Sequence, residues 1–193
     1  MRVFLAGASG VIGLRLVPLL VAAGNEVSAM TRTAAKRPLL RELGAHPVVC
    51  DVYDAEALRA AVVSFDPDLV MHQLTDLPDT PDRIPEFAAR NDRIRTEGTR
   101  NLLAAARAAG AHRFMAQSIA WLRPTGGEAV AEHERMVLDA GGLVIRYGRL
   151  YGPGTFYPDT PPAQPRIHVD QAARETVRLM DAEPGVAEAV EGP

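Results

Sequence analysis

The sequence predicts an α/β fold, a doubly wound parallel sheet with helices on both faces, and three observations lead to it. Short apolar runs of strand length alternate with amphipathic helical stretches along the chain, which is the pattern of right-handed βαβ crossovers. The first apolar run leads directly into a glycine-rich turn that opens a helix. With 193 residues, of which 47% are hydrophobic, the chain suits a single domain over 1–193 with one sizeable core.

Six strands are expected, each a short apolar run next to a glycine or a polar turn, at 2–6, 26–30, 46–50, 67–72, 112–116 and 142–146. Six helices are expected at 11–23, 38–43, 55–63, 86–109, 128–140 and 171–182. In the longest helix small and apolar residues recur at helical spacing, and close packing is the expected reason for Gly98 within it. Asp170 is expected to cap the last helix, and residues 184–193 to form a loose tail.

Composition argues against several classes of function. The net charge of −3 gives no reason to expect nucleic acid or an anionic membrane as a partner. The sequence has no recognisable signal peptide and no apolar run of the ~20 residues that span a membrane, so a cytoplasmic location is expected. The single cysteine, Cys50, excludes an internal disulfide and is expected to fill the core. The five histidines lack metal-ligand spacing, so no metal is expected.

A glycine loop, residues 7–13, follows the first expected strand with the pattern G-x-x-G-x-x-G. Gly7 permits a tight turn, Gly10 lets the backbone approach a pyrophosphate, and Gly13 lets the helix pack closely. Free backbone N–H groups and the helix dipole favour an anion at this point. The other expected dinucleotide contacts in the loop are Ser9, Val11 and Ile12. The arrangement is that of a Rossmann-type domain, and the alternative is a tight strand–helix turn without a ligand.

The end of the second expected strand selects the cofactor. NAD-binding domains usually have an acidic residue there for the ribose 2′-hydroxyl, whereas this chain has Arg32, whose guanidinium suits a 2′-phosphate. Lys36 and Arg37 add positive charge nearby. NADP(H) is therefore the preferred cofactor, with NAD(H) possible; the alternative is that Arg32 is simply solvated. Asp51, followed by Val52, is expected to accept a hydrogen bond from the adenine amine, or else to cap the next turn.

A series of short runs follows the glycine loop in order along the chain. They are Asp51-Val52, EGTRNLL at 97–103, AGAHRF at 109–114, Arg146-Tyr147, YGPGT at 151–155 and IHVD at 167–170. Together they resemble the extended short-chain dehydrogenase/reductases, the NAD-dependent epimerase/dehydratase group, over nearly the whole chain as far as Asp181. The resemblance implies a nucleotide-binding enzyme of that group.

The family's catalytic pair, Tyr-x-x-x-Lys, cannot exist in this chain, because no tyrosine precedes a lysine by four residues and the only lysine is Lys36. If Glu134 is aligned with the glutamate that commonly follows the motif, the Tyr and Lys positions fall on Gly126 and Val130. The family's helix asparagine falls on Arg95, with Asn91 one turn earlier.

Three residues are the candidates for catalysis. Ser118 resembles the family's active-site serine, although Ile119 could occupy that position and Ser118 could equally cap the strand end. Tyr147 and Tyr151 flank the expected mouth of the sheet and could donate a proton, although packing is the commoner role. His133 is more simply explained as a solvated surface residue.

The resemblance also bears on the substrate region and on assembly. Few residues separate Thr155 from His168, where the family inserts most of its substrate domain, so 152–167 is expected to be a reduced lid loop. In the family the two helices matching 86–109 and 128–140 pair with their copies, which predicts a homodimer. The small-residue surface for that contact is Ala104, Ala105, Ala106, Ala108 and Ala109.

Three functions fit these observations. The chain could be an atypical NADP(H)-dependent oxidoreductase acting on a small-molecule substrate. It could be a non-redox isomerase, cyclase or dehydratase on the same fold, or a nucleotide-binding sensor without catalysis.

Overall fold

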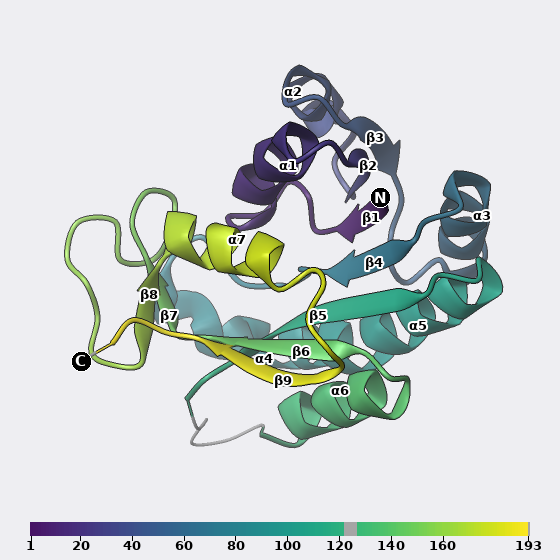
Figure 1. Cartoon of the computed structure of the whole chain (residues 1–193). Coiled ribbons are helices and arrows are strands. Elements are labelled where there is room, and N and C mark those ends of the chain that lie inside the picture. The colour runs from purple at the N-terminus through teal and green to yellow at the C-terminus, as the bar shows by residue number, and fades with distance from the viewer. Residues whose placement is uncertain (122–126, 193) are drawn as a thin grey trace.

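A computed structural model describes residues 1–121 and 127–192 of the chain. Its centre is a seven-stranded sheet in the order β3-β2-β1-β4-β5-β6-β9, in which every pairing is parallel (Figure 1). The strands are β1 (Arg2–Ala6), β2 (Glu26–Thr31), β3 (His46–Val49), β4 (Leu69–His72), β5 (Arg113–Ile119), β6 (Leu143–Tyr147) and β9 (Gly185–Ala189). The doubly wound parallel sheet that the sequence predicts is confirmed.

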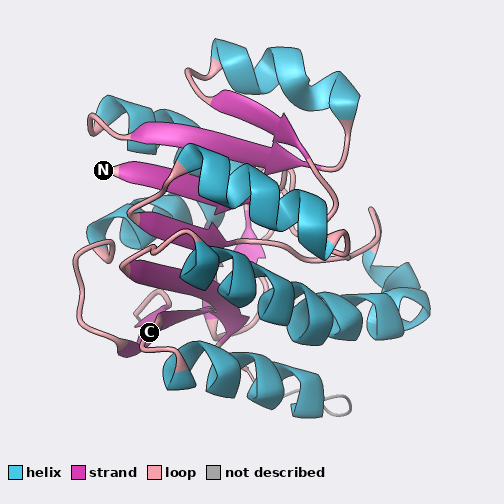
Figure 2. Cartoon of the chain, turned by 90° about the vertical axis from the view of Figure 1, so that its right-hand side faces the viewer, coloured by secondary structure: helices cyan, strands magenta, loops and turns pink. Residues whose placement is uncertain are grey.

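Helices cover both faces of the sheet (Figure 2). They are α1 (Gly13–Ala22), α2 (Arg37–Glu42), α3 (Ala55–Phe65), α4 (Ile84–Arg93), α5 (Thr99–Ala108), α6 (Gly127–Asp139) and α7 (Val169–Arg178), with the 3₁₀ turns η1 (Ala34–Lys36) and η2 (Pro81–Arg83). Alternate residues of β1 face opposite layers, as strand geometry requires. Val3 and Leu5 pack in a core with α1 and α7, whereas Phe4 and Ala6 pack in a second core with α3 and α5.

The helix expected over 86–109 begins earlier, at Ile84, and contains a break in its hydrogen-bond pattern. Between α4 and α5, residues Ile94–Gly98 form a π-helical segment, η3. Such segments insert an extra residue into a turn and are frequent near functional sites. Here the segment carries Ile94 into the cleft described below. A Cβ at Gly98 would lie 3.5 Å from Val52 Cγ1, an ordinary contact, so close packing does not explain that glycine.

Two expectations about the C-terminal part are wrong. Within the expected loose tail, 184–193, residues Gly185–Ala189 form β9, because they continue the sheet as a parallel partner of β6. The last helix is capped by His168, whose Nδ1 accepts from the Asp170 backbone N–H at 3.2 Å, not by the Asp170 side chain.

The expected lid loop, 152–167, is held at both ends. β7 (Arg149–Tyr151) and β8 (Arg166–His168) pair in parallel as a separate two-stranded sheet, so the loop emerges from one strand and returns through the other. In the parts of the chain that the structure describes, none of the helices combines the length and apolar character needed to cross a membrane.

Candidate functional site

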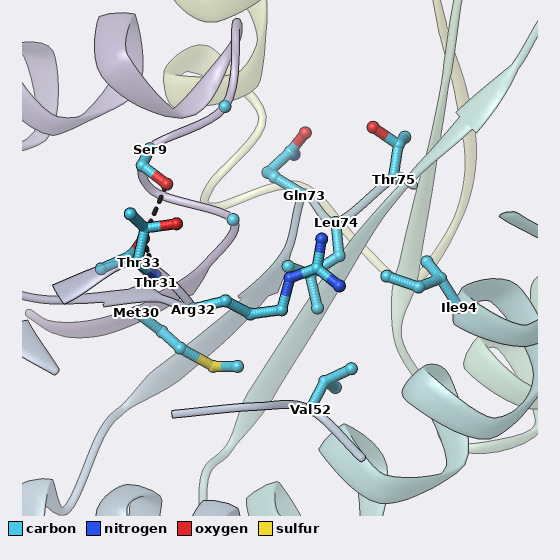
Figure 3. A pocket seen from close by; sticks show the side chains of 12 residues that line it. Ser9, Met30, Thr31, Arg32, Thr33, Val52, Gln73, Leu74, Thr75 and Ile94 are labelled. Carbon is cyan, nitrogen blue, oxygen red and sulfur yellow. Dashed lines mark hydrogen bonds between the residues drawn. The ribbon is translucent and has the colours of Figure 1, made fainter. Parts of the chain in front are cut away.

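A cleft of about 170 Å³ opens at the carboxyl ends of β1, β2 and β4. Its lining comes from the glycine loop, from residues 30–33 at the end of β2, from residues 73–75 after β4, and from Val52 and Ile94 (Figure 3). The strand order reverses here, between β1 and β4, and doubly wound sheets bind their ligands at such a point. Since ligand pockets usually measure ~300–1,000 Å³, this cleft would enclose only part of a dinucleotide.

The three loop glycines have different steric reasons. Gly7 has a φ of +93°, and a Cβ there would lie 2.7 Å from the carbonyl carbon of Gln73. A Cβ at Gly13 would collide with the carbonyl oxygen of Gly7 and the backbone of Ala8. At Gly10 a Cβ would lie near one atom of the described residues beyond its chain neighbours, the Gly7 oxygen, 3.3 Å away. The fold itself therefore demands Gly7 and Gly13, while Gly10 leaves open the space that an anion would use.

Hydrogen bonds fasten the glycine loop to the end of β2. The Ala8 backbone N–H donates to the Met30 carbonyl at 3.1 Å, and the Ser9 and Thr31 hydroxyls lie 2.8 Å apart. Thr31 Oγ1 also accepts from the Thr33 backbone N–H at 3.2 Å. The loop that would hold a pyrophosphate and the strand end that would meet the ribose are thus positioned as one unit.

Arg32 extends into the cleft, toward Val52 and Ile94 (Figure 3). One of its terminal nitrogens lies 3.7 Å from a carboxylate oxygen of Asp76, a residue only 7% exposed. Asp76 already accepts two hydrogen bonds from Arg90, at 2.9 and 3.1 Å. Two guanidinium groups therefore share one carboxylate, which leaves this end of the cleft with a net positive charge. A phosphate would be attracted there.

Some of the residues expected to contact the cofactor line the cleft and others do not. Gly7, Ser9, Gly10, Arg32 and Val52 line it, whereas Val11, Ile12, Gly13 and Asp51 are outside the lining that the described residues form. The Asp51 carboxylate accepts from the Tyr53 backbone N–H at 3.0 Å, which is the turn-capping alternative.

Ser118 lies in β5, and its hydroxyl is engaged. It donates to Glu134 Oε1 at 2.5 Å, and Arg146 binds both oxygens of the same carboxylate. Burial alone would raise the pKa of Glu134, but the hydrogen bonds from Arg146 and Ser118 outweigh it and hold that pKa below its usual value. Ser118 is 1% exposed and does not belong to the described lining of the cleft.

Both candidate tyrosines are also hydrogen-bonded inside the protein. The Tyr147 hydroxyl bonds to Thr176 Oγ1 and accepts from Gln73 Nε2 at 3.3 Å, and burial raises the pKa of Tyr147 to about 12. The Tyr151 hydroxyl donates to Glu191 at 2.6 Å, and this hydrogen bond raises the pKa of Tyr151. The structure therefore does not bring Ser118, Tyr147 and Tyr151 together at one point of the described cleft.

The positions aligned with the family's catalytic pair and with its helix asparagine are Gly126, Val130 and Arg95, with Asn91 one turn before Arg95. Gly126, aligned with the family's tyrosine, lies outside the described residues, and Val130 lies on α6. Asn91 Oδ1 accepts from the Asp76 backbone N–H at 3.2 Å, and Arg95 is 3% exposed. Within residues 1–121 and 127–192, no three His, Cys, Asp or Glu side chains gather where they could hold a metal ion.

A buried chain of hydrogen bonds lies behind the cleft, and the expectation of a solvated His133 is wrong. His133 is 0% exposed, because α6 turns it toward the sheet. The Leu74 N–H donates to His72 Nδ1 at 3.2 Å, and His72 Nε2 lies 3.1 Å from Thr99 Oγ1. Thr99 Oγ1 lies 2.6 Å from His133 Nδ1, and His133 Nε2 lies 2.9 Å from the Gln117 carbonyl.

The two ends of this chain fix where the ring protons lie. The Leu74 N–H can only donate, so His72 Nδ1 accepts and His72 is neutral with its proton on Nε2; the Gln117 carbonyl can only accept, so His133 has a proton on Nε2. Burial favours the neutral form of His133, and Thr99 then accepts from His72 Nε2 and donates to His133 Nδ1. Burial lowers the pKa of His72 well below its usual value and that of His133 to about 4, with the Arg95 charge adding to both effects.

Sequence reasoning missed Gln73, Leu74 and Thr75 as cleft residues. They follow the expected strand at 67–72, and the carboxyl ends of neighbouring parallel strands meet at one edge of a sheet. That rule could have found them once β4 was placed beside β1. Ile94 could not be found this way, because only the packing of the π-helical segment brings it to the cleft.

Comparison with known proteins agrees with this geometry. Residues 7–139 match the model of a family described as NAD(P)H-binding. A 3-diazoavenalumate denitrifying reductase from Streptomyces sp is 45% identical over 182 residues, which cover 81% of this chain and 59% of the reductase. A 3-beta-hydroxysteroid dehydrogenase from Mycolicibacterium neoaurum is 32% identical over 118 residues, 59% of this chain and 31% of the dehydrogenase. The chain thus spans less than two thirds of the length of either relative.

Solved structures share the fold. A UDP-glucose 4-epimerase from Thermus thermophilus, in complex with NAD, matches with a TM-score of 0.81 at 20% identity, over 100% of this chain and 78% of the epimerase. A putative NAD-dependent epimerase/dehydratase from Bacillus halodurans matches with a TM-score of 0.78 at 22% identity, over 100% of this chain and 94% of the other. The fold expected from the resemblance to short-chain dehydrogenase/reductases of the epimerase/dehydratase group is confirmed.

Proposed function

Because the chain belongs to the NAD(P)H-binding family that its residues 7–139 match, we propose that it is an NADP(H)-dependent enzyme of the short-chain dehydrogenase/reductase type. Its substrate is a small oxygenated molecule, and the reaction is a reduction or oxidation of that molecule. The observation that carries the choice of cofactor is Arg32, which stands in the cleft where NAD-binding domains usually have an acid.

The residues of the cleft fit an NADP dinucleotide. The loop around Gly10 leaves room for a pyrophosphate at the start of α1, and Arg32 provides a guanidinium for the 2′-phosphate. When bound, the nicotinamide ring would accept or deliver the hydride. The similarity to a reductase at 45% identity supports a redox reaction.

Ser118, Tyr147 and Tyr151 are all candidates for the residue that exchanges a proton with the substrate, and none of the three is preferred. Each would have to exchange its present hydrogen bond to Glu134, Thr176 or Glu191 before it could serve a substrate. A tyrosine with a pKa of about 12, as at Tyr147, is a poor acid/base group at neutral pH without an activating lysine. Turnover is therefore expected to be slow on ordinary substrates of the family.

The cofactor choice is tested by the dissociation constants of NADPH and NADH. The wild type should bind NADPH more tightly than NADH, because only NADPH carries the 2′-phosphate that Arg32 would meet. Arg32→Ala should weaken NADPH by about ten- to hundredfold, the loss of a charged contact worth ~1.5–3 kcal/mol, and change NADH little. Isothermal titration calorimetry measures both ligands on the same preparations.

Arg59→Ala is the matched control for this test. Arg59 is an exposed arginine on α3, and within the part of the chain that the structure describes it neither lines the cleft nor pairs with Asp76 or Arg32. It should leave the ratio of the two dissociation constants nearly unchanged. Equal affinities of the wild type for NADPH and NADH would refute the cofactor choice.

A second candidate is a nucleotide-binding protein that catalyses no net redox reaction. The hydrogen-bonded state of Ser118, Tyr147 and Tyr151 favours it, since none offers a free hydroxyl in this structure. The two candidates differ in one assay, the nicotinamide absorbance of NADPH mixed with a panel of ketones, sugars and quinones. A steady loss of absorbance supports the redox enzyme; conversion of a substrate at constant absorbance supports a non-redox isomerase, cyclase or dehydratase.

A further inference from the structure

One buried polar atom of a residue that lines the cleft has no partner in the parts of the chain that the structure describes. Gln73, the residue directly after β4, is 8% exposed and lines the cleft, and its side-chain oxygen Oε1 accepts no hydrogen bond there. A buried carbonyl oxygen without a donor costs about 1–3 kcal/mol, so such an atom needs an explanation. Figure 3 shows the Gln73 side chain between the glycine loop and Thr75, separate from the Arg32 guanidinium.

The orientation of the Gln73 amide follows from the bonds beyond it. Thr176 Oγ1 donates to the Ala172 carbonyl at 2.8 Å, so it can only accept from the Tyr147 hydroxyl. Tyr147, having given its proton to Thr176, can only accept from Gln73, and it does so from Nε2 at 3.3 Å. Turning the amide over would face a carbonyl oxygen toward a hydroxyl that has no proton left to give. Oε1 is therefore held as the free acceptor.

The position of Gln73 indicates which part of a dinucleotide it would meet. In the sheet order β2-β1-β4, Arg32 follows β2, the glycine loop follows β1 and Gln73 follows β4. If the 2′-phosphate is at Arg32 and the pyrophosphate at the glycine loop, the molecule continues across β1 toward β4. The groups that arrive at Gln73 then belong to the half beyond the pyrophosphate, whose hydrogen-bond donors are ribose hydroxyls and a carboxamide.

We propose that Gln73 positions the second nucleoside half of the dinucleotide, with Oε1 accepting a hydrogen bond from a ribose hydroxyl or the carboxamide of that half. Tyr147 acts through Gln73, because its buried hydroxyl and Thr176 hold the amide in place. This gives Tyr147 a positioning role in cofactor binding. The inference rests on the proposed function, since it takes a dinucleotide as the ligand.

The experiment compares three ligands on the wild type and on Gln73→Leu. NADPH has both nucleoside halves, 2′-phospho-ADP-ribose lacks the nicotinamide, and adenosine 2′,5′-bisphosphate lacks the second half. Gln73→Leu should weaken NADPH by about tenfold, the worth of one hydrogen bond to a group left unpaired without it, and leave the bisphosphate unchanged. A loss for 2′-phospho-ADP-ribose assigns the contact to a ribose hydroxyl; no loss for it assigns the contact to the carboxamide.

Two further variants keep the test decisive. Asn25→Leu is the control, because it also exchanges an amide side chain for leucine, while Asn25 lies just before β2, at the opposite end of that strand from Arg32, and is outside the described lining of the cleft. It should weaken none of the three ligands selectively. Tyr147→Phe removes the hydroxyl that holds the Gln73 amide, so it should weaken NADPH in part and the bisphosphate not at all. It also answers the question if Gln73→Leu fails to fold.

Two results would overturn this inference and leave the proposed function standing. These are an equal loss for all three ligands, which indicates general damage to the cleft, and an unchanged affinity of Gln73→Leu for NADPH. If the wild type binds none of the three ligands, the proposed function fails and the inference fails with it.

Discussion

At the scale of single residues, the glycine loop separates what the fold needs from what a ligand needs. A Cβ at Gly7 or at Gly13 would lie against backbone atoms, whereas among the described residues beyond its chain neighbours a Cβ at Gly10 would meet just the Gly7 oxygen, at 3.3 Å. The sequence pattern could predict all three glycines and Arg32, because both signals are local. It could not predict Gln73, since the orientation of its amide depends on Tyr147 and Thr176, which are distant in sequence.

Gly10→Val tests this division of roles. The branched side chain would fill the space where a pyrophosphate approaches the start of α1, so NADPH affinity should fall by about a hundredfold or more. The fold should persist, with a circular dichroism spectrum like that of the wild type. Gly13→Val, by contrast, should lower the unfolding temperature markedly, because its Cβ would meet the Gly7 oxygen and Ala8. Normal NADPH binding by Gly10→Val would mean that the nucleotide site is elsewhere.

At the scale of elements, the hydrogen-bond chain from β4 to β5 ties four parts of the molecule together. His72 ends β4, Thr99 begins α5, His133 lies on α6, and the Gln117 carbonyl belongs to β5. Protonating His72 would place a donor against the Leu74 N–H, and protonating His133 would force the Thr99 hydroxyl to turn its proton away from His133 Nδ1. Sequence reasoning could place His133 on a helix, but helical periodicity alone did not tell which face was buried.

The chain of neutral histidines predicts a loss of stability in mild acid. The pKa of each is lowered in the folded state, so below pH ~6.5 the unfolded state binds more protons and acidification favours unfolding. The stabilisation is fully present above pH ~6.5 and is lost as the pH falls toward about 4, the folded pKa of His133. Between pH 7.5 and 5, His133 alone should lower the free energy of unfolding by about 2 kcal/mol, measured by urea denaturation.

Substitution of the histidines separates this effect from other titrations. The double variant His72→Asn, His133→Asn should be less stable at pH 7.5 yet show a flatter pH dependence down to pH 5. His46→Asn is the control, because the His46 side chain is 71% exposed, and it should keep the slope of the wild type. A double variant that retains the full slope would assign the acid sensitivity to other groups.

At the scale of the whole molecule, the sequence could predict the layers but not the last strand or the small sheet. Alternation of apolar runs with helical stretches is a local signal, and it places six of the seven strands of the main sheet. β9 is a five-residue strand at the edge of the sheet, and two of its residues, Val186 and Glu188, are exposed. It forms a strand because it pairs with β6. Such pairings join residues far apart in the chain, which local patterns do not record.

A homodimer is also a prediction about the whole molecule, and the exposure of the alanines on α5 narrows the surface that it would use. Of the five alanines on α5 and at its end, Ala105 and Ala106 pack in the chain's own core, while Ala104 and Ala108 are exposed one turn apart. Leu138 on α6 is 38% exposed. Small residues let two helices approach closely, and an exposed leucine on the next helix would gain from being covered.

We expect a two-fold homodimer in which α5 and α6 pack against their copies. Light scattering at micromolar concentration should report twice the chain mass of 20.8 kDa. Ala108→Arg should shift the mass toward the monomer, because in a two-fold contact each substitution places a charged side chain at the interface from both partners. Ala22→Arg, at an exposed position on α1 across the sheet, should leave the dimer intact. A monomeric wild type would contradict the dimer. A dimer that is insensitive to Ala108→Arg but disrupted by Ala22→Arg would place the contact elsewhere on the chain.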